Sequence, residues 1–427
     1  MIVSTFPKLS QTFVLDQVRG LIERGHEVDI FSLAGPCPDG TPQHTDFDQL
    51  GLKQRTFAAI AKPRSKLRCL QLSGRLFCRQ LVLDPLWLGR WLASCFRGKP
   101  APLRYLDAIV PRLSQGNYDI VHCQFGTLGN KALALELTDA PFNRLVVTFR
   151  GHDISSELRR RGPRIYDRLL KRADLVMANC DFFAHRLLAM NCDPAKLHVH
   201  RSGIDCDRFS FRQPSPPQQR PVRLITVGRL VEKKGIIFAL EAISGLLNQG
   251  KSLEYRIIGD GPEKERYLQF VRAHGLQDVV RFLGACPQAS VTTHLRQSDL
   301  FIASNITSQK GDQDAPINTL KEAMATGLPV VATRHGGIPE LVEDGVSGYL
   351  IPEGDSKAIQ ERIVWLLDHK ELWCKLAESG RRRVEQEYDL EQWNDVLVQR
   401  YFEVLGQSLK SSRCDEKTKS HNRDCAA

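Results

Sequence analysis

Two carboxylates separated by seven residues are the strongest candidates for chemistry in this sequence. Asp314 lies just before the predicted start of a helix, where a carboxylate is electrostatically favoured, and Glu322 lies about two turns further along that helix. Such a pair can reach into one ligand, with one carboxylate on a sugar and the other on a ribose diol. For Asp314 taken alone, an acid that caps the helix N-terminus is the alternative.

A cationic loop follows a predicted strand at residues 222–227. Gly228 lets the backbone approach a ligand, Arg229 and Lys234 supply two positive charges, and a helix that begins near Gly235 presents free N–H groups. Together these features predict a diphosphate site. A surface turn with solvated cations is the alternative.

Two further glycine turns follow predicted strands. Gly259 and Gly261 form a G-x-G that lacks the third glycine of the dinucleotide fingerprint, because residue 264 is lysine. This difference argues against a nicotinamide or flavin enzyme. Gly336 and Gly337 turn into another predicted helix and offer a second place for phosphate oxygens.

The first half of the chain carries weaker candidates. Arg150 and His152 come directly after a predicted strand at residues 145–149. His152 can donate to a substrate hydroxyl or phosphate, and Arg150 can pair with an anion. A structural role beside Asp153 is the alternative for this histidine. His122, at the end of another predicted strand, is a weaker candidate of the same kind.

Short apolar runs alternate with longer helical stretches and predict the elements that position these residues. Apolar strands in a repeated strand–helix–strand order favour parallel sheets covered on both faces. The predicted strands are residues 2–6, 27–33, 119–122, 145–149, 174–178, 197–199, 222–227, 255–258, 279–283, 300–303 and 328–332. We therefore expect an α/β protein with two doubly wound, Rossmann-like domains facing each other across a cleft, with ligands at the carboxyl ends of the strands.

The proline-rich segment 213–221 predicts the linker between these domains, because it can form neither a helix nor a central strand. It separates a first domain at residues 1–212 from a second domain at residues 222–389. A helix at residues 390–406 can pack on either domain. Residues 407–427 are polar and patternless, and we expect them to be disordered.

Three motifs, by their order and spacing, resemble the family-4 retaining glycosyltransferases of GT-B fold. They are Gly228-Arg229 with Lys234-Gly235, then residues 259–262 (Gly-Asp-Gly-Pro), then Asp314 followed after seven residues by Glu322-Ala-Met-Ala-x-Gly-x-Pro-Val-Val. Residues 6–14, 122–126 and 149–153 are similar to the branch of this family that builds colanic acid and other exopolysaccharides. The similarity runs from Met1 to about Leu405, apart from the basic middle region.

The resemblance implies transfer of a sugar from a UDP- or GDP-sugar donor to a lipid-linked or polysaccharide acceptor, with retention at the anomeric carbon. It implies no cofactor and no obligatory metal, with the acceptor on the first domain and the nucleotide-sugar on the second. Arg229 and Lys234 would hold the donor diphosphate, Glu322 would bind the ribose, and Asp314 would contact the donor sugar. The backbone at residues 336–337 would lie near phosphate or uracil-type groups.

The three residues predicted to be catalytic are Asp314, His152 and Arg150, and two of them depart from the family pattern. Asp314 stands where the family has a glutamate. Arg150 stands where the family has the histidine of an H-G-x-D motif, with His152 two places further on.

The charge of the chain is concentrated in one region. The 427 residues carry a formal net charge of +10, and residues 60–104 contain ten basic residues and one acid, Asp84, interleaved with leucine, phenylalanine and tryptophan. This composition suits an anionic membrane surface or an anionic lipid-linked ligand. A solvated helix face with ordinary core packing is the alternative. No recognised nucleic-acid-binding motif accompanies the charge, so nucleic acid is not expected as a partner.

Other features restrict the class of protein. The sequence has no charge-free apolar window of about 18 residues and no basic segment followed by an apolar one at its start, so neither a spanning helix nor a secretory signal is predicted. The twelve cysteines include no C-x-x-C pair, which gives a zinc site or a dense disulfide framework little support. We expect a cytoplasmic protein, peripheral at the inner face of the cytoplasmic membrane if residues 60–104 engage it.

Two rival interpretations share these features. A GT-B sugar-nucleotide epimerase or hydrolase would use the same cleft without an acceptor. A non-catalytic membrane-docking subunit of a polysaccharide assembly complex would instead depend on residues 60–104.

Overall fold

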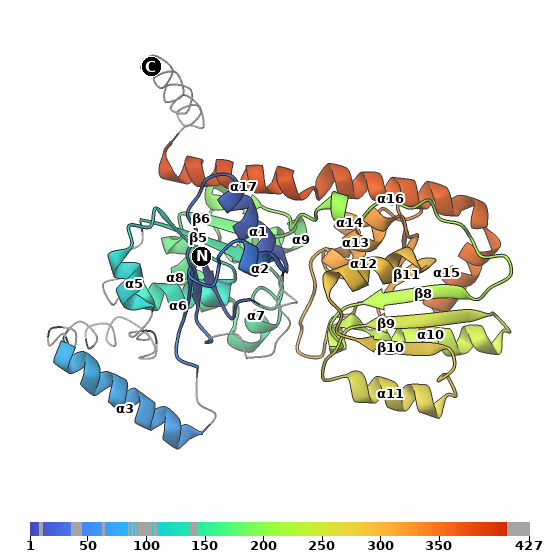
Figure 1. The fold of residues 1–427 in the computed structure, drawn as a ribbon, viewed down its shortest axis with the longest axis horizontal. Helices are drawn as coiled ribbons and strands as arrows, with labels where there is room; N and C mark the ends of the chain where they lie inside the picture. The colour runs from blue at the N-terminus through green and yellow to red at the C-terminus, as the bar shows by residue number, and fades with distance from the viewer. Residues whose placement is uncertain are drawn as a thin grey trace, which may run out of the picture.

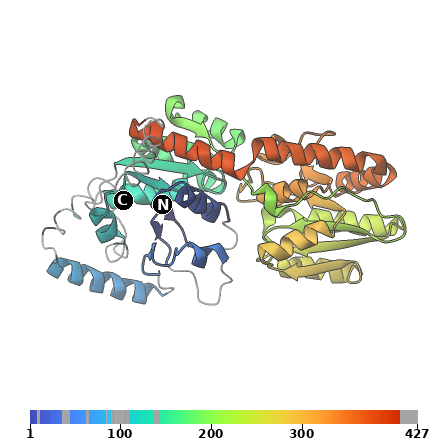
Figure 2. The same ribbon diagram turned by 45° about the horizontal axis from the view of Figure 1, so that its top comes forward.

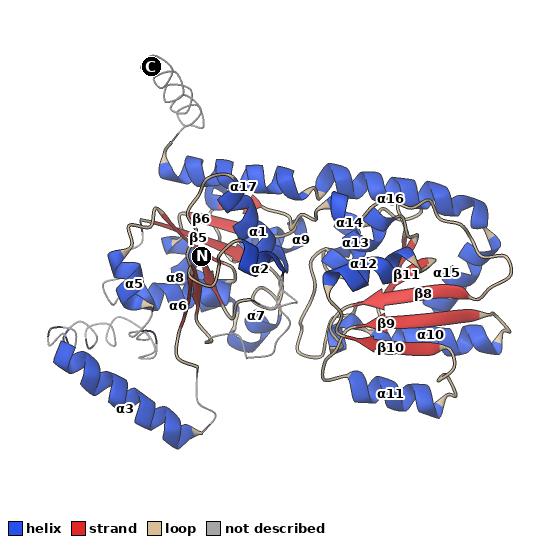
Figure 3. Cartoon of the chain, in the orientation of Figure 1, coloured by secondary structure: helices blue, strands red, loops and turns tan. Residues whose placement is uncertain are grey.

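The chain folds into two parallel sheets, each packed between helices, that lie next to each other along the molecule (Figure 1). The computed structural model describes residues 1–7, 12–35, 45–61, 65–83, 86, 89, 92, 105, 109–136 and 143–407. Figure 3 colours the strands of both sheets red and the surrounding helices blue. The predicted α/β class with two doubly wound, Rossmann-like domains is confirmed.

The first sheet has seven parallel strands in the order β3-β2-β1-β4-β5-β6-β7. The strands are β1 Ile2–Val3, β2 Ile30–Ser32, β3 Thr56–Ala58, β4 Ile120–Cys123, β5 Arg144–Phe149, β6 Leu175–Ala178 and β7 Leu197–Val199. The helices of this part are α1 Thr12–Glu23, α2 Thr45–Gln49, α3 Lys66–Leu83, α5 Val110–Gln115, α6 Gly126–Glu136, α7 Ser156–Arg161, α8 Asp167–Arg172 and α9 Asp181–Ala189. Strand β6 is buried throughout, and this explains its continuous apolar sequence.

The second sheet has six parallel strands in the order β10-β9-β8-β11-β12-β13. The strands are β8 Val222–Val227, β9 Leu253–Ile258, β10 Val280–Gly284, β11 Leu300–Ala303, β12 Val330–Thr333 and β13 Tyr349–Ile351. The helices are α10 Ile236–Asn248, α11 Lys264–Ala273, α12 Gln288–Arg296, α13 Asn318–Thr326, α14 Ile338–Leu341, α15 Ser356–Asp368 and α16 Trp373–Glu387. In each sheet the strand order reverses beside the first strand, β1 or β8, which creates a crevice at its carboxyl end.

The chain crosses between the two domains at two segments that pair with each other. The Ile204 N–H donates to the Tyr388 carbonyl at 2.9 Å, and the Leu390 N–H donates to the Ile204 carbonyl at 3.1 Å. Glycine is required at residue 203, because a Cβ on Gly203 would lie 2.6 Å from the Leu390 Cα. These two segments are therefore the connection about which one domain can move relative to the other.

Helix α17, Leu390–Leu405, returns to the first domain and packs against α1. Its residues Leu397, Val398 and Tyr401 join the hydrophobic core that contains the buried face of α1. Figure 2 shows α17 lying across the first domain, while α16 stays on the second. The chain therefore begins and ends its described structure on the same domain.

Two features of the fold differ from the sequence prediction. Strands β3 and β13, each three residues long at the edge of its sheet, were not expected. The predicted linker 213–221 lies against the second domain, where Lys370 Nζ donates to the Pro217 carbonyl at 3.1 Å and Arg220 pairs with Asp299 at 2.6 Å. The crossing between domains therefore lies upstream of that linker.

Of residues 60–104, the structure describes α3 and a few neighbouring positions, and residues 408–427 of the predicted tail lie outside the described residues. None of the helices in the described part of the chain combines the length and the apolar composition needed to cross a bilayer.

Candidate active site

A cleft of about 1070 Å³ opens between the two domains. Most of the predicted site residues line it, and these are Arg150, His152, Gly228, Arg229, Lys234, Gly259, Asp314 and Glu322. Gly261, Gly336 and Gly337 are not among the lining residues. Loops that follow strands of both sheets therefore meet at this cleft. Ligands of open parallel sheets bind beyond the carboxyl ends of the strands, which is where these loops lie.

The two predicted cations after β8 have different surroundings. The Arg229 side chain is exposed to the cleft, and among the described residues it has no hydrogen-bond or ion-pair partner. Lys234 is largely buried, and its Nζ lies 2.9 Å from Asp314 Oδ2. Burial lowers the pKa of Lys234, and the Asp314 carboxylate opposes this effect. Arg229 is therefore the cation that is ready to meet an anionic ligand, whereas Lys234 already has a counter-charge.

The glycines of the next loop allow it to pack against this cationic loop. A Cβ on Gly259 would lie 1.9 Å from the Gly228 carbonyl oxygen, and a Cβ on Gly261 would lie 2.3 Å from the Leu230 carbonyl oxygen. Any side chain at these two positions would push the loops apart. Gly261 therefore contributes to the shape of the site although it does not line the cleft.

Asp314 is held by three donors. Lys233 Nζ lies 2.9 Å from Oδ1, Lys234 Nζ lies 2.9 Å from Oδ2, and Asn305 Nδ2 donates to Oδ2 at 2.7 Å. Burial raises the pKa of this carboxyl, but the charges of the two lysines outweigh burial and hold it well below its ordinary value. Asp314 therefore stays ionised at neutral pH and cannot act as a proton donor.

The glycine pair at residues 336–337 packs against the loop that carries Asp314. A Cβ on Gly336, whose φ is +50°, would lie 2.1 Å from the Asp314 carbonyl oxygen, and one on Gly337 would lie 2.6 Å from Pro316 Cδ. The absence of side chains at residues 336–337 therefore lets this segment pack closely against the Asp314 loop.

His335 holds the same loop by hydrogen bonds. Its Nε2 accepts from the Asp314 N–H at 2.9 Å, and its Nδ1 lies 2.7 Å from Glu353 Oε1. Because Nε2 is an acceptor, the ring proton of the neutral imidazole lies on Nδ1 and donates to Glu353. The histidine thus links the Asp314 backbone to an acid in the loop after β13.

Helix α13 carries Glu322 into the cleft. Its side chain is buried, and burial raises the pKa of this carboxyl to about 7, although a hydrogen bond with Gln288 opposes the shift. A buried carboxyl at this pKa can accept or donate a hydrogen bond near neutral pH, which suits contact with a diol. The predicted pair Asp314 and Glu322 therefore lines one cavity, with one carboxylate ionised and the other close to its titration midpoint.

Replacing Glu322 by glutamine is expected to stabilise the fold at pH 8. The pKa of Glu322 is about 7 in the folded protein and has its ordinary value of 4.5 in the unfolded chain. The folded state therefore favours the protonated carboxyl, and the stability that this contributes is fully present below pH 4.5 and is lost as the pH rises through 7. At about 1.4 kcal/mol per pKa unit, the loss is on the order of 3 kcal/mol. Urea unfolding should show Glu322→Gln more stable than wild type at pH 8 and equal to it at pH 4. The exposed Glu371→Gln is the control, and equal stability of Glu322→Gln and wild type at pH 8 would contradict the prediction.

On the first domain, His152 and Arg150 lie differently. His152 is exposed in the cleft, with its ring centroid 5.1 Å from that of Phe125. Asp153 is not its partner, because the Asp153 carboxylate accepts from the backbone N–H groups of residues 126, 150 and 151. Arg150 is buried and hydrogen-bonds to neutral side chains. His122 does not line this cleft; it is buried and hydrogen-bonds to Tyr401 and Thr148.

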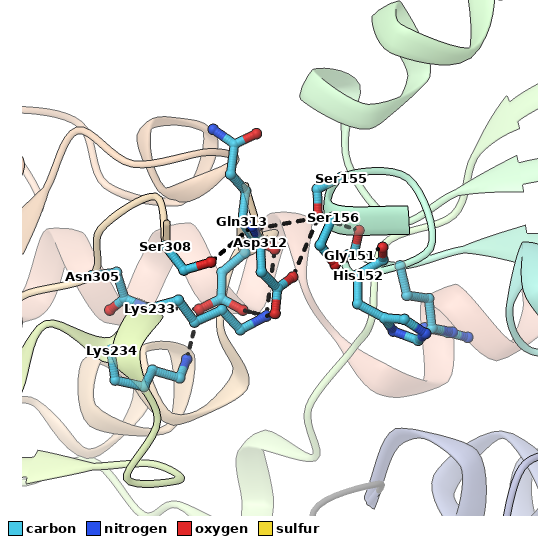
Figure 4. Close-up of polar contacts among 12 residues, drawn as sticks. Gly151, His152, Ser155, Ser156, Lys233, Lys234, Asn305, Ser308, Asp312 and Gln313 are labelled. Carbon is cyan, nitrogen blue, oxygen red and sulfur yellow. Dashed lines mark hydrogen bonds and ion pairs between the residues drawn. The ribbon is translucent and has the colours of Figure 1, made fainter. Parts of the chain in front are cut away.

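The two domains contact each other directly beside the cleft (Figure 4). Ser155 Oγ accepts from the Gln313 N–H at 3.2 Å, and its single proton is shared between the Gly151 carbonyl at 2.7 Å and Asp312 Oδ1 at 3.2 Å. The other Asp312 oxygen lies 3.0 Å from Lys233 Nζ, which also contacts Asp314. Ser155 thus connects the first domain to the charged cluster around Asp314.

Replacing Ser155 by alanine is expected to lower kcat/KM by about threefold to tenfold, because a net hydrogen bond is worth about 1 kcal/mol. Ser156→Ala is the matched control, since Ser156 Oγ donates to the His152 carbonyl within its own loop. Steady-state kinetics of both variants make the comparison. Equal values for the two variants would show that the contact between domains does not matter to turnover.

Sequence reasoning missed Lys233, Asn305 and Ser155 as site residues, and it gave Asp312 only as a neighbouring acid that leaves the register of Asp314 open. A signal for Lys233 was present, because two adjacent lysines and two acids at residues 312 and 314 have matching charge. Asn305 and Ser155 gave no signal, because their contacts with this cluster depend on the fold.

The two Rossmann-like domains with a cleft between them form a fold of GT-B type. The sequence profile of Glycosyltransferase Family 4 matches residues 10–208, and that of Glycosyl transferases group 1 matches residues 207–383. WcaL of Salmonella typhimurium, named as a colanic acid biosynthesis glycosyltransferase, is 35% identical over 92% of this chain and 96% of its own length. AmsK of Erwinia amylovora, an amylovoran biosynthesis glycosyltransferase, is 32% identical over 90% of this chain and 94% of its own.

Solved structures agree with the fold. Sucrose-phosphate synthase from Thermosynechococcus elongatus superposes with a TM-score of 0.70 at 18% identity, covering 93% of this chain and 94% of that one. Anabaena HepE in complex with UDP-glucose superposes with a TM-score of 0.65 at 20% identity, covering 93% and 98%. The chain belongs to glycosyltransferase family 4 and is a sugar-transferring enzyme.

Proposed function

We propose that this enzyme transfers a hexosyl group from a UDP- or GDP-sugar to a lipid-linked or polysaccharide acceptor, with retention, in exopolysaccharide synthesis. The observation that carries the proposal is one cleft with Arg229, Lys234, Asp314 and Glu322 on the second domain and His152 on the first. The names of WcaL and AmsK support a role in exopolysaccharide synthesis, and the HepE complex supports a UDP-sugar donor. In this proposal the second domain binds the donor and the first binds the acceptor.

The difficult step breaks the bond between the anomeric carbon and the diphosphate oxygen. Negative charge grows on the leaving phosphate, and Arg229 and Lys234 are the cations that stabilise it. The acceptor hydroxyl oxygen then bonds to the anomeric carbon on the same face, and its proton passes to the leaving phosphate. This route explains why Asp314, which stays ionised, need not donate a proton. His152 is exposed in the cleft and can orient the acceptor hydroxyl.

We propose that the reaction needs no bound metal, because Arg229 and Lys234 supply the charge that a divalent cation provides to diphosphates elsewhere. Lys233 strengthens this arrangement by sharing Asp314 with Lys234. The proposal includes no tightly bound cofactor, because the nucleotide-sugar is consumed as a substrate.

The test is transfer from radiolabelled UDP-glucose and GDP-mannose to a bacterial membrane lipid extract, with the anomeric configuration of the product read by NMR. The proposal predicts a labelled lipid or polymer whose new linkage keeps the configuration of the donor. An inverted linkage would overturn retention. Release of free or epimerised sugar at the same rate with and without the extract would instead support an epimerase or hydrolase.

We also propose that α3 docks the enzyme on an anionic membrane surface from the cytoplasmic side. The helix contains Lys66, Arg68, Arg75 and Arg79 and no acid. Its leucines 67 and 70 are 65% and 72% exposed, and in Figures 1 and 2 it lies at the outer side of the first domain, away from the second. An exposed helix with this composition binds anionic lipid by charge and by apolar burial together.

Cosedimentation with vesicles tests the docking proposal. Wild type is expected to bind vesicles with about 30% phosphatidylglycerol several-fold better than pure phosphatidylcholine vesicles, because each basic residue near the surface contributes about 1 kcal/mol. The double variant Leu67→Gln/Leu70→Gln should lose most of this binding. Retained binding by that variant, or equal binding to both vesicle types, would argue against docking by α3.

A further inference from the structure

Arg150 is a buried cation at the wall of the cleft, and the hydrogen-bond partners of its guanidinium in the described part of the chain are all neutral. Its side chain is only 8% exposed and lines the cleft. Its Nη2 donates to Gln124 at 2.8 Å and to Gln17 at 3.2 Å, its Nε donates to Gln124 at 3.2 Å, and its Nη1 donates to Ser202 Oγ at 2.9 Å. The guanidinium also lies 4.4 Å from the Phe13 ring centroid. Among the residues that the structure describes, these four bonds leave one N–H of the five unused.

A second buried cation approaches the same place from the other domain. Lys321, on α13, is 1% exposed, and its Nζ donates to the Ser202 carbonyl at 2.6 Å and to Asn318 Oδ1 at 3.1 Å. Its Nζ lies 4.7 Å from the Tyr388 ring centroid. Ser202 therefore contacts one cation through its hydroxyl and the other through its carbonyl, and both Ser202 and Asn318 line the cleft.

Among the described residues, no carboxylate forms a hydrogen bond or ion pair with either cation, although Asp153 attracts Arg150 and Glu322 attracts Lys321 without direct contact. The Asp153 carboxylate is used by backbone N–H groups and makes no contact with the guanidinium. Burial raises the pKa of Glu322, next to Lys321, to about 7. Burial lowers the pKa of Arg150 to about 10 and that of Lys321 to about 7, and the two positive charges also repel each other. A buried charge without a directly paired counter-ion is costly, so the region favours an additional anion.

We propose that Arg150, supported by Lys321, forms an anion subsite for the acceptor, and hence that the acceptor carries a negative group close to the hydroxyl that reacts. The negative group is an oxyanion that accepts a hydrogen bond from the remaining guanidinium N–H. Both the phosphate of a lipid linkage and the carboxylate of an acidic sugar have this chemistry. The inference rests on the proposed function, since it assigns the first-domain wall of the cleft to the acceptor. It also gives a role to arginine at a position where the resembling family has histidine, because only arginine keeps its charge when buried.

Calorimetric titration with matched probes tests the subsite on the full chain. Octyl β-D-glucuronide against octyl β-D-glucoside isolates a carboxylate, and glucose 1-phosphate against methyl α-D-glucoside isolates a phosphate. Wild type is expected to bind at least one charged probe about tenfold more tightly than its neutral match, a difference of about 1.4 kcal/mol. The pair that shows the difference identifies the source of the anion.

Two variants attribute the preference to Arg150. Arg150→Gln, which keeps hydrogen bonding and removes the charge, should bring the affinity ratio close to one, and Arg150→Lys should keep part of it. Thermal melts of both variants check that they fold. Equal affinity of wild type for charged and neutral probes, including no binding of either, or an unchanged ratio in Arg150→Gln, would overturn the subsite. Binding of UDP and GDP to wild type is measured in parallel. If neither nucleotide binds, the proposed function is contradicted. If a nucleotide binds but the charged and neutral probes bind equally, only the anion subsite is contradicted.

Discussion

Arg229→Ala is expected to lower kcat/KM about a hundredfold or more while leaving the melting temperature unchanged. Arg229 is exposed in the cleft and has no ion-pair partner among the described residues, so its removal leaves no buried charge behind. Removing one preorganised contact to a developing negative charge typically reduces the rate about a hundredfold to a thousandfold. Steady-state kinetics with the nucleotide-sugar that is turned over, together with a thermal melt, make the measurement.

The matched control is Arg266→Ala, an exposed arginine on α11 that pairs with Glu263 on the surface. It should change neither quantity beyond a small factor, because surface pairs of this kind contribute little. A loss of less than about threefold in Arg229→Ala would contradict a role for Arg229 in stabilising the leaving diphosphate. It would also favour the interpretation of the protein as a non-catalytic docking subunit.

Asp314→Asn is expected to destabilise the fold by about 3–5 kcal/mol at pH 7 and to abolish most activity. The substitution leaves Lys234 without a counter-charge in a largely buried place and leaves Lys233 paired with Asp312 alone, and breaking a buried ion pair from one side has this typical effect. Asp314→Glu, which restores the glutamate of the resembling family, should keep the charge and lose much less stability. Urea unfolding at pH 7 compares the three proteins.

The pH dependence gives a second check on Asp314. Its folded pKa lies well below the ordinary 3.8, so the stability it contributes is present above pH 3.8 and lost as pH falls below that value. The stability difference between wild type and Asp314→Asn should therefore shrink between pH 5 and pH 3. The exposed Asp278→Asn should show no such difference at either pH. A difference that is absent at pH 7, or that grows toward pH 3, would show that Asp314 is not held by the two lysines.

The sequence predicted well those parts of the site that depend on local order. Loops after strands of a doubly wound sheet meet at one edge, and Arg229, Lys234 and Asp314, which were predicted on such loops, line one cleft. The helix that follows Asp314 likewise brings Glu322 into the same cavity. The fold class was predicted for the same reason, because buried parallel strands appear as separate apolar runs.

Other parts depended on contacts between distant segments and were not predictable from one sequence. Gly336 and Gly337 were expected near phosphate oxygens, and their close packing against residues 314 and 316, with a left-handed backbone at Gly336, had no local sequence pattern. The neutral surroundings of Arg150 come from residues 17, 124 and 202, which only the fold brings together. The Ser155–Asp312 contact joins residues 157 positions apart and has no local pattern.

The sequence alone also did not show on which domain the last helix, α17, packs. Its apolar face fits any surface of similar shape, and the decision for the first domain comes from its contact with α1 and from the crossing beside Gly203. Both depend on how the two domains are joined.

The central claim is that the second domain binds a nucleoside diphosphate through the cations after β8 without a metal. A thermal-shift comparison of UDP, GDP and ADP, each with EDTA and with Mg²⁺, on wild type and Lys234→Ala tests it most directly. A ligand at 100 times its dissociation constant stabilises the fold by about 2.7 kcal/mol, which such a measurement detects. The account predicts that one nucleotide class raises the melting temperature equally with EDTA and with Mg²⁺, and that Lys234→Ala loses most of this shift. No shift with any nucleotide, or a shift that appears only with Mg²⁺, would contradict it.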